Sequence, residues 1–254
     1  MSIQRISALV LLTRLTGHLW LVALGCSKAA HMEDLQVPAA VPPSACVVVG
    51  FLGGHDARDD ASKGVRQLAL RLREPRLRYT ETFSNQSRKL AEEFLLATLD
   101  RNGDGVISID ERRKLVVYGQ SYGGAAVVKF TWRLARRQVP VYLTVQIDSV
   151  GTDDARIPPN VTFAANLYQE NGWIIAGENP IRAVDPSRTR ILGNWLFDYD
   201  SPPGSEITID DLSFWKKLMR VAHAKMDRDP RVWALTESLI RAACEAKGLD
   251  PAPG

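Results

Sequence analysis

The feature that most constrains the fold is the pentapeptide GQSYG at residues 119–123, which fits the pattern G-x-S-x-G. Before it, residues 115–118 form a short apolar, β-branched run typical of a buried parallel strand. After it, apolar residues recur at helical spacing at Ala125, Val128, Trp132 and Ala135. The glycines permit an unusual backbone turn and a close helix–strand approach. The sequence therefore predicts a strand, a tight turn and a helix, with Ser121 raised above a sheet edge.

A serine in such a turn can act as a nucleophile when a base takes its proton. Where this motif is catalytic in an α/β chain, the order along the sequence is serine, acid, histidine. Only one histidine lies downstream of Ser121, and it is His223, just before the last predicted helix. We therefore expect Ser121 to be the nucleophile and His223 its base. An ordinary turn serine and a histidine on a helix surface are the alternatives.

The acid that would orient His223 has four candidates. Asp148 directly follows the apolar run 141–147, which predicts a strand that would hold its carboxylate at the same sheet edge as Ser121. We favour Asp148, since a carboxylate at the end of a buried strand requires a partner. Glu170 follows the next predicted strand, and Asp198 and Asp200 follow the one after that.

Backbone amides that stabilise an oxyanion are expected at two places. Residues 45–50 predict an early buried strand, which is followed by the glycine-rich run FLGGH at 51–55. Loops after an early strand supply one donor in α/β serine hydrolases, and the residue after the nucleophile supplies the other. By position we assign these donors to the amides of Phe51, with Leu52 as the alternative, and of Tyr122. His55 is expected at the surface or behind the site.

A second motif, DRNGDGVISIDE at residues 100–111, fits a twelve-residue EF-hand calcium loop. Glycine stands at the turn position, Gly105, and Ile107 is the apolar plug of the loop. The alternative is a polar helix-to-strand turn rich in Asp and Gly. The predicted Ca²⁺ ligands are Asp100, Asn102, Asp104, the carbonyl of Val106, Ser108 and the carboxylate of Glu111.

The residues around this loop differ from an EF-hand. An entering helix is predicted, with Ser84 able to cap it and Leu90, Phe94, Leu95 and Leu99 on one face. No exiting helix is predicted, because only three basic residues separate Glu111 from the predicted strand before Ser121. No second loop of this type is present in the sequence. We therefore expect a structural Ca²⁺ clip on that strand, not a calcium sensor.

The first thirty residues predict an export signal. Their apolar segments are interrupted by Arg14 and His18, and neither reaches the roughly 20 residues of a membrane span. Residues 23–26 resemble a lipobox, which would attach a lipid to Cys26, and residues 27–30 fit an ordinary signal peptidase. A non-exported amphipathic start is the third possibility. The expected organisation is a signal at 1–30, a Pro/Ala-rich linker at 31–43 and one folded domain at 44–254.

The net charge and the cysteine content limit the kinds of partner and compartment that can be expected. Arg5, Arg14 and Lys28 are the only charged residues of the first thirty, so the net charge of +3 falls to zero in the remainder. A neutral domain without a basic stripe is not expected to bind nucleic acid. Cys46 and Cys244 either form a disulfide in an oxidising compartment or are buried thiols. Nothing in the sequence defines the oligomeric state.

The rest of the chain alternates between the two kinds of element. Further strands are predicted at 77–83, 161–168 and 188–197, and helices at 59–73 and over part of 211–224. The last helix begins with Asp229 as its cap and Pro230 at its first position. Its predicted buried residues are Val232, Leu235, Leu239, Ile240 and Ala243.

Together these features resemble the α/β-hydrolase superfamily, in particular lipase- and esterase-like serine hydrolases. The resemblance rests on residues 47–54, 116–124, 146–151 and 166–169 and on the region of His223. Gln120 and Val49 stand where many members carry histidine, and neither difference removes a chemical role. The resemblance implies an α/β fold with a mostly parallel sheet and helices on both faces. The calcium-like loop is not a general feature of this superfamily.

The resemblance also implies a function. Ser121 would attack an ester-type carbonyl of a small-molecule or lipid substrate, with no organic cofactor, and water would release the product. The short chain between Asp148 and His223 favours a small lid, if any. The alternative is a non-catalytic secreted protein that uses the pocket for a ligand or the loop for calcium. Calcium control of activity is a third hypothesis, and the single unpaired loop disfavours it.

Overall fold

A computed structural model of the chain describes residues 31–38, 41–73, 77–171, 180–210 and 214–246. Its centre is a six-stranded sheet in which every neighbouring pair is parallel. The spatial order is β2-β1-β3-β4-β6-β8. In chain order these strands are β1 (Cys46–Leu52), β2 (Thr80–Ser84), β3 (Lys114–Gln120), β4 (Val141–Ile147), β6 (Val161–Tyr168) and β8 (Arg190–Leu196). A separate two-residue pair joins β5 (Arg156–Ile157) to β7 (Arg182–Ala183).

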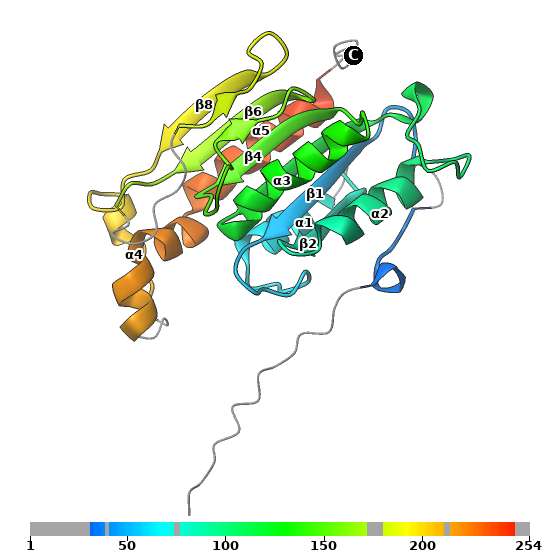
Figure 1. The fold of residues 1–254 in the computed structure, drawn as a ribbon. Helices are drawn as coiled ribbons and strands as arrows, with labels where there is room; N and C mark the ends of the chain where they lie inside the picture. The colour runs from blue at the N-terminus through cyan, green and yellow to red at the C-terminus, as the bar shows by residue number, and fades with distance from the viewer. Residues whose placement is uncertain (1–30, 39–40, 74–76, 172–179, 211–213, 247–254) are drawn as a thin grey trace, which may run out of the picture.

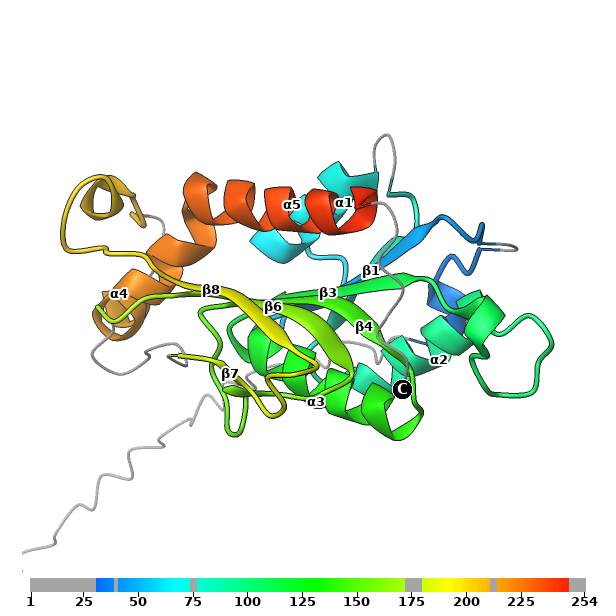
Figure 2. The ribbon, with the colours of Figure 1, turned by 90° about the horizontal axis from the view of Figure 1, so that it is seen from above.

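Helices cover both faces of this sheet (Figures 1 and 2). One face packs against α1 (Gly64–Arg73) and α5 (Pro230–Glu245), and the other against α2 (Arg88–Leu99) and α3 (Tyr122–Arg136). The remaining helix, α4 (Phe214–Arg228), lies beyond the end of the sheet. Three short 3-10 turns complete the described chain: Met32–Asp34, Ile109–Glu111 and Gly204–Glu206. The predicted α/β fold with a parallel sheet between two layers of helices is confirmed.

The core forms because the central strands are apolar on both sides. Along β1, Val47, Val49 and Phe51 pack toward α2 and α3, whereas Val48 and Leu52 pack toward α1 and α5. Strands buried on both faces are expected to be mainly apolar, and β1 has no polar side chain, whereas β3 and β4 each include two polar residues. The carboxyl ends of these adjacent strands all lie at one edge, so the turns that follow them are neighbours.

The boundaries of several elements differ from those expected. The helix expected at 59–73 begins at Gly64, and the N-cap of α2 is Ser87 instead of Ser84. Ser84 Oγ lies 2.7 Å from Ser87 Oγ, so it contacts the cap without being one. On α3, Trp132 is 37% exposed, and Phe130 and Leu134 are buried in its place. The helix contacts β1, β3 and β4 through a face rotated from the one that the spacing predicted.

The closing helix agrees closely with the sequence. It starts at Pro230, and the carboxylate of Asp229 accepts a hydrogen bond from the amide of Arg231. Val232 and Ile240 are fully buried, whereas Leu235 and Leu239 are only partly buried at the edge of the core. A cap followed by proline and an apolar stripe is a helix signal that tertiary contacts rarely override.

The segment expected as a linker carries part of the core. Leu35 and Val41 are each 8% exposed and pack into the cluster under α2 and α3. The guanidinium of Arg113 donates to the carbonyl of Val41 at 3.2–3.3 Å. The predicted signal at 1–30, with Cys26, lies outside the described residues.

A disulfide between Cys46 and Cys244 joins the first residue of β1 to α5, and the two Cα atoms are 5.5 Å apart. Of the two states considered for these cysteines, the structure has the disulfide. It closes a segment with a sequence separation of 198 residues. No helix among the described residues is long and apolar enough to cross a membrane.

Candidate active site

Ser121 occupies a strained turn between β3 and α3. Its φ is 59° and its ψ is −129°, a region that residues with a side chain seldom adopt. The turn is held by backbone hydrogen bonds on both sides. The amide of Ser121 donates to Ile147 O at 2.9 Å, and its carbonyl accepts from Gly124 at 2.8 Å and from Val150 at 3.1 Å. The serine is therefore tied to the turn that follows β4.

Glycine is required beside this serine because backbones meet there. A Cβ added to Gly123 would lie 2.0 Å from the carbonyl oxygen of Phe51. One added to Gly119 would lie 2.4 Å from the carbonyl oxygen of Gly123. The helix after the serine can pack directly on β1 only if both positions lack a side chain, which explains the glycines on either side of Ser121.

Asp148 and His223 form the closest polar contact of the site. The Oδ2 atom of Asp148 lies 2.6 Å from Nδ1 of His223. Asp148 is fully buried at the end of β4 with a φ of 43°, and its amide donates to Leu167 O at 2.7 Å. This contact occupies Nδ1, so Nε2 is the ring nitrogen of His223 that can accept the hydroxyl proton of Ser121. The helix α4 therefore carries the imidazole to a carboxylate on the central sheet.

Gln169, directly after β6, supports the same carboxylate. Its Nε2 atom lies 3.3 Å from each of the two oxygens of Asp148. Gln169 is fully buried, so its amide replaces water as a donor to Asp148. No local pattern in the sequence indicates this contact, because it depends on the register between β4 and β6.

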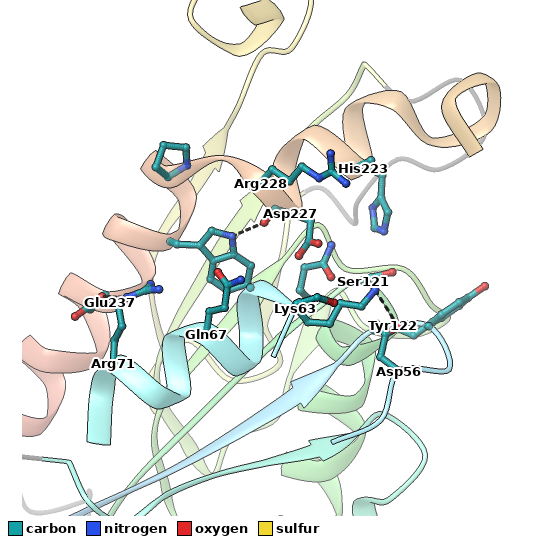
Figure 3. Close-up of a pocket in the computed structure, with 18 of the residues that line it drawn as sticks. Asp56, Lys63, Gln67, Arg71, Ser121, Tyr122, His223, Asp227, Arg228 and Glu237 are labelled. Carbon is teal, nitrogen blue, oxygen red and sulfur yellow. Dashed lines mark hydrogen bonds and ion pairs between the residues drawn. The ribbon is translucent and has the colours of Figure 1, made fainter. Parts of the chain in front are cut away.

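Ser121 and His223 line one pocket, and Figure 3 shows the imidazole pointing toward the serine. Ser121 is 7% exposed and His223 is 8% exposed. The described residues give no hydrogen bond between the Ser121 hydroxyl and the imidazole. Hydrogen bonds of this kind are often long in the absence of substrate. The structure thus gathers Ser121, His223 and Asp148 at the carboxyl edge of the sheet.

The other candidate acids are placed differently. Glu170 is exposed. Asp198 and Asp200 are also exposed, and both accept hydrogen bonds from the side-chain amide of Asn171, at 3.1 and 2.7 Å. Among these carboxylates, only Asp148 contacts His223 in the described part of the chain.

The structure places the expected oxyanion donors in different surroundings. Phe51 and its alternative Leu52 are fully buried in β1, which continues two residues further than predicted. Neither residue lines the pocket. The pocket is lined instead by Gly53 and Gly54. A Cβ on Gly53 would lie 2.9 Å from Cβ of Ser121, so this turn is next to the serine. Tyr122 lines the pocket and begins α3, where amides have no partner within the helix.

The calcium-like loop projects from the end of α2, and Val106 at its tip is 57% exposed. Asp100 accepts hydrogen bonds from the amides of Gly103 and Gly105, each at 2.7 Å. Glu111 accepts from the hydroxyl of Ser108 at 2.7 Å, from the Ser108 amide at 3.0 Å and from the Arg101 amide at 2.7 Å. Bonds from Ser108 and then Arg101 lower the pKa of Glu111 to about 2.

Backbone amides therefore hold the carboxylates of this loop. Among the described residues, no group of three or more His, Cys, Asp or Glu side chains lies in a position to hold a metal ion. Ile107 is buried in the core, as expected for the plug position. The loop donor set of carboxylates, an amide oxygen and a carbonyl suits Ca²⁺ chemically, but the Glu111 carboxylate faces Ser108 in this conformation.

Together the fold and site define an α/β protein with a serine, a histidine and an aspartate at the carboxyl edge of a parallel sheet. No protein-family model and no curated protein matches the chain. The structure is similar to a cutinase-like protein from Cryptococcus sp., with a TM-score of 0.43 and 12% identity over 84% of this chain and 100% of that one. It is also similar to RedJ, solved with a PEG molecule in its active site, with a TM-score of 0.28 and 12% identity over 64% and 83%. Neither similarity carries a conclusion about activity.

Proposed function

We propose that the chain is a serine hydrolase that cleaves ester-type bonds through an acyl-enzyme on Ser121. The observation that carries this proposal is the 2.6 Å contact between the buried Asp148 and His223, which lines the same pocket as Ser121. A buried carboxylate on one imidazole nitrogen directs the other toward a nucleophile. The positive φ of Ser121 supports the same proposal, because strain of this kind gathers at functional turns.

In the proposed reaction, the hydroxyl oxygen of Ser121 attacks the ester carbonyl while Nε2 of His223 takes the hydroxyl proton. Asp148 stabilises the resulting imidazolium and keeps the ring in place. The C–O bond to the alcohol then breaks, and His223 returns the proton to the departing oxygen. A water molecule, deprotonated by His223, attacks the acyl-enzyme and releases the acid and free Ser121.

Two backbone amides are proposed to stabilise the oxyanion. One is the N–H of Tyr122, at the start of α3, where the helix dipole favours negative charge. The other comes from the turn at Gly53 and Gly54, which packs against the serine. The loss of one such donor typically costs about 3–4 kcal/mol of transition-state stabilisation.

The proposal is tested by labelling the purified protein with a fluorophosphonate probe that reacts with activated serines. We expect labelling of the wild type and none of Ser121→Ala. Asp148→Asn should label at least about 100-fold more slowly, because the imidazole loses its orienting carboxylate. Absence of labelling in the wild type, with the protein folded by circular dichroism, would exclude the enzyme and leave the non-catalytic binding protein.

We also propose that residues 100–111 bind Ca²⁺ as a structural clip on β3. Asp100, Asn102, Asp104, Ser108, Glu111 and the carbonyl of Val106 would be the ligands. Binding requires Glu111 to leave Ser108 and turn toward the loop oxygens. A site of about 1 mM affinity at about 10 mM Ca²⁺ would stabilise the fold by about 1.4 kcal/mol.

This calcium proposal predicts a rise of a few degrees in Tm with Ca²⁺ relative to EDTA. Mg²⁺ at the same concentration is the control for ionic strength, and Glu111→Gln should abolish the calcium effect. Equal Tm values in Ca²⁺, Mg²⁺ and EDTA would show that the loop is an ordinary turn.

Finally, we propose that the protein functions outside the reducing cytosol. The Cys46–Cys244 disulfide supports this, since such bonds persist mainly in oxidising compartments. Detection of the protein in periplasmic or culture fractions, with and without Cys26→Ser, would test export and lipid attachment together.

A further inference from the structure

The pocket extends well beyond the residues that the proposed chemistry uses. Its volume is about 1110 Å³. From Ser121 and His223 it continues along a groove between α1 and α5, and Arg71 and Glu237 lie at the far end (Figure 3). The two helices meet closely, because a Cβ on Gly64 would lie 2.1 Å from the ring of Trp233. The groove is therefore a fixed part of the fold.

The lining of this groove combines polar and apolar surface, and its apolar part comes from small or aromatic residues such as Trp233, Pro230 and Ala234. None of the lining residues that the structure describes is Val, Ile, Leu, Met or Phe. Six of them are charged, with equal numbers of each sign: Asp56, Lys63, Arg71, Asp227, Arg228 and Glu237.

Most of these charges have partners within the protein. Lys63 Nζ lies 3.1 Å from Asp56 Oδ1, and Arg71 Nε lies 3.0 Å from Glu237 Oε2. Neither pair needs a ligand to balance its charge. Each still presents hydrogen-bonding atoms to the groove.

Asp227 differs from the others. It lies one turn after His223 on α4, and its carboxylate has no hydrogen-bond or ion-pair partner in the described part of the chain. Its backbone carbonyl accepts a 2.7 Å hydrogen bond from Trp233 Nε1, which fixes the helix end beside the groove. Burial raises the pKa of Asp227 above its ordinary value of 3.8, against the opposing influence of Lys63 and His223. The carboxylate of Asp227 therefore lacks a hydrogen-bond donor, and a ligand in the groove could supply one.

We propose that the groove between α1 and α5 binds the hydroxylated part of the substrate, so that the enzyme acts on sugar- or polyol-type esters, with Asp227 accepting a hydrogen bond from a substrate hydroxyl. This inference rests on the proposed esterase function. It adds the class of substrate and a specificity-determining residue outside the catalytic group.

Two other classes of ligand fit the groove less well. A long alkyl chain would remove water from Lys63, Asp227 and Arg71 without replacing their hydrogen bonds, which is costly. An ionic ligand would have to compete with the ion pairs already formed, in a groove whose formal charges cancel. Hydroxyl groups donate to the carboxylates and accept from the cations, so they satisfy both kinds of group.

The test measures binding of intact esters to Ser121→Ala, which cannot form an acyl-enzyme, by ligand-observed NMR titration. Two matched pairs of esters test the alcohol side and the acyl side of the ester bond separately. On the alcohol side, a methyl glucoside acetylated on its primary hydroxyl is compared with cyclohexylmethyl acetate. On the acyl side, methyl gluconate is compared with methyl hexanoate.

We expect the hydroxylated member of at least one pair to bind about 10- to 100-fold more tightly than its apolar counterpart, as for hydrogen bonds to a charged group. In Ser121→Ala/Asp227→Leu this preference should fall to about threefold or less. Ser121→Ala/Asp227→Asn should keep most of it, since the amide oxygen still accepts. Ser121→Ala/Asp59→Leu, which removes an exposed carboxylate outside the groove, is the matched control and should leave the preference intact.

Tighter binding of both apolar members, or a preference that persists in Ser121→Ala/Asp227→Leu, would overturn the proposal. These outcomes do not depend on turnover. Fluorophosphonate labelling of Ser121 in the wild type tests the esterase function by itself, so failure of the function and failure of the hydroxyl-binding groove are separate results.

Discussion

Asp148 owes its position to contacts with side chains from two other parts of the chain. His223 approaches it from α4, and Gln169 donates to both of its oxygens from the end of β6. A buried carboxylate needs hydrogen-bond donors, and here an amide supplies them in place of water. We therefore regard Gln169 as a positioning residue for the proposed reaction.

This role predicts the behaviour of Gln169→Leu. The substitution keeps the side-chain size and removes the donor, so Asp148 becomes free to rotate away from His223. We expect kcat, or the rate of fluorophosphonate labelling, to fall about 10-fold with KM changed less than about 2-fold.

The matched control is Glu170→Gln, which alters the exposed neighbouring residue and should label at the wild-type rate. If instead Gln169→Leu labels normally while Glu170→Gln does not, the acid has been assigned to the wrong residue. Circular dichroism and Tm of both variants separate a positioning effect from a loss of folding.

At the residue scale, the sequence could predict those candidate site residues that belong to a recognisable local pattern. Ser121 followed from its motif, His223 from being the only downstream histidine, and Asp148 from its place after an apolar run. The end of β1 was predicted two residues too early, so Phe51 and Leu52 lie within the strand and the pocket is lined by Gly53 and Gly54. Gln169 and Asp227 could not be found, since their significance comes from neighbours brought close by folding.

At the scale of elements, the site depends on how closely α3 packs against β1. Gly123 lies against the carbonyl of Phe51, and Gly119 against the carbonyl of Gly123. A helix that packs this closely begins directly after Ser121 and next to β1. Any side chain at these positions would push the helix away from the sheet.

We therefore predict that Gly123→Ala destabilises the protein by about 3 kcal/mol or more, because the new Cβ meets backbone that cannot move aside. Chemical denaturation gives this number, and fluorophosphonate labelling should be lost in parallel.

The comparison for Gly123→Ala is Gly105→Ala, measured in EDTA. Gly105 has a positive φ of 78° but open space around it, so we expect a cost of about 1–2 kcal/mol and normal labelling. A cost for Gly123→Ala no larger than that for Gly105→Ala would show that the helix–strand contact is looser than described.

Strands were more predictable than helix faces. The runs at 141–147 and 161–168 match β4 and β6 residue for residue. Both strands are apolar over most of their length, and each has proline or a polar residue directly before and after it. The face of α3 was partly wrong, since Trp132 fits the helical spacing but is 37% exposed. This helix lies against three strands, so a wide arc of it is buried and spacing alone cannot fix the centre of that arc.

At the scale of the whole molecule, the disulfide joins the first strand of the central sheet to the last described helix. Cys46 opens β1, and Cys244 lies near the end of α5. A cross-link over a sequence separation of 198 residues strongly restricts the unfolded chain. It also holds α5, one wall of the pocket, against the sheet.

We predict that Cys244→Ser lowers the free energy of unfolding by about 2–4 kcal/mol. Urea denaturation of wild type and variant should give different midpoints without reductant and nearly the same midpoint after full reduction. If the two proteins unfold alike under non-reducing conditions, the cysteines do not form the bond in solution. Fluorophosphonate labelling of Cys244→Ser under native conditions should persist, because the bond lies far from the serine.

The strands all run in one direction, which gives the sheet two different rims. The rim at the carboxyl ends carries Ser121, Asp148 and the glycine turn, and the opposite rim carries the disulfide. A tether placed near the disulfide, for example at Glu245, would orient the molecule on a bead or an electrode with its pocket facing the solution. The same polarity allows substitutions that tune one rim to be combined with substitutions that reinforce the other, because the effects of substitutions without shared contacts usually add.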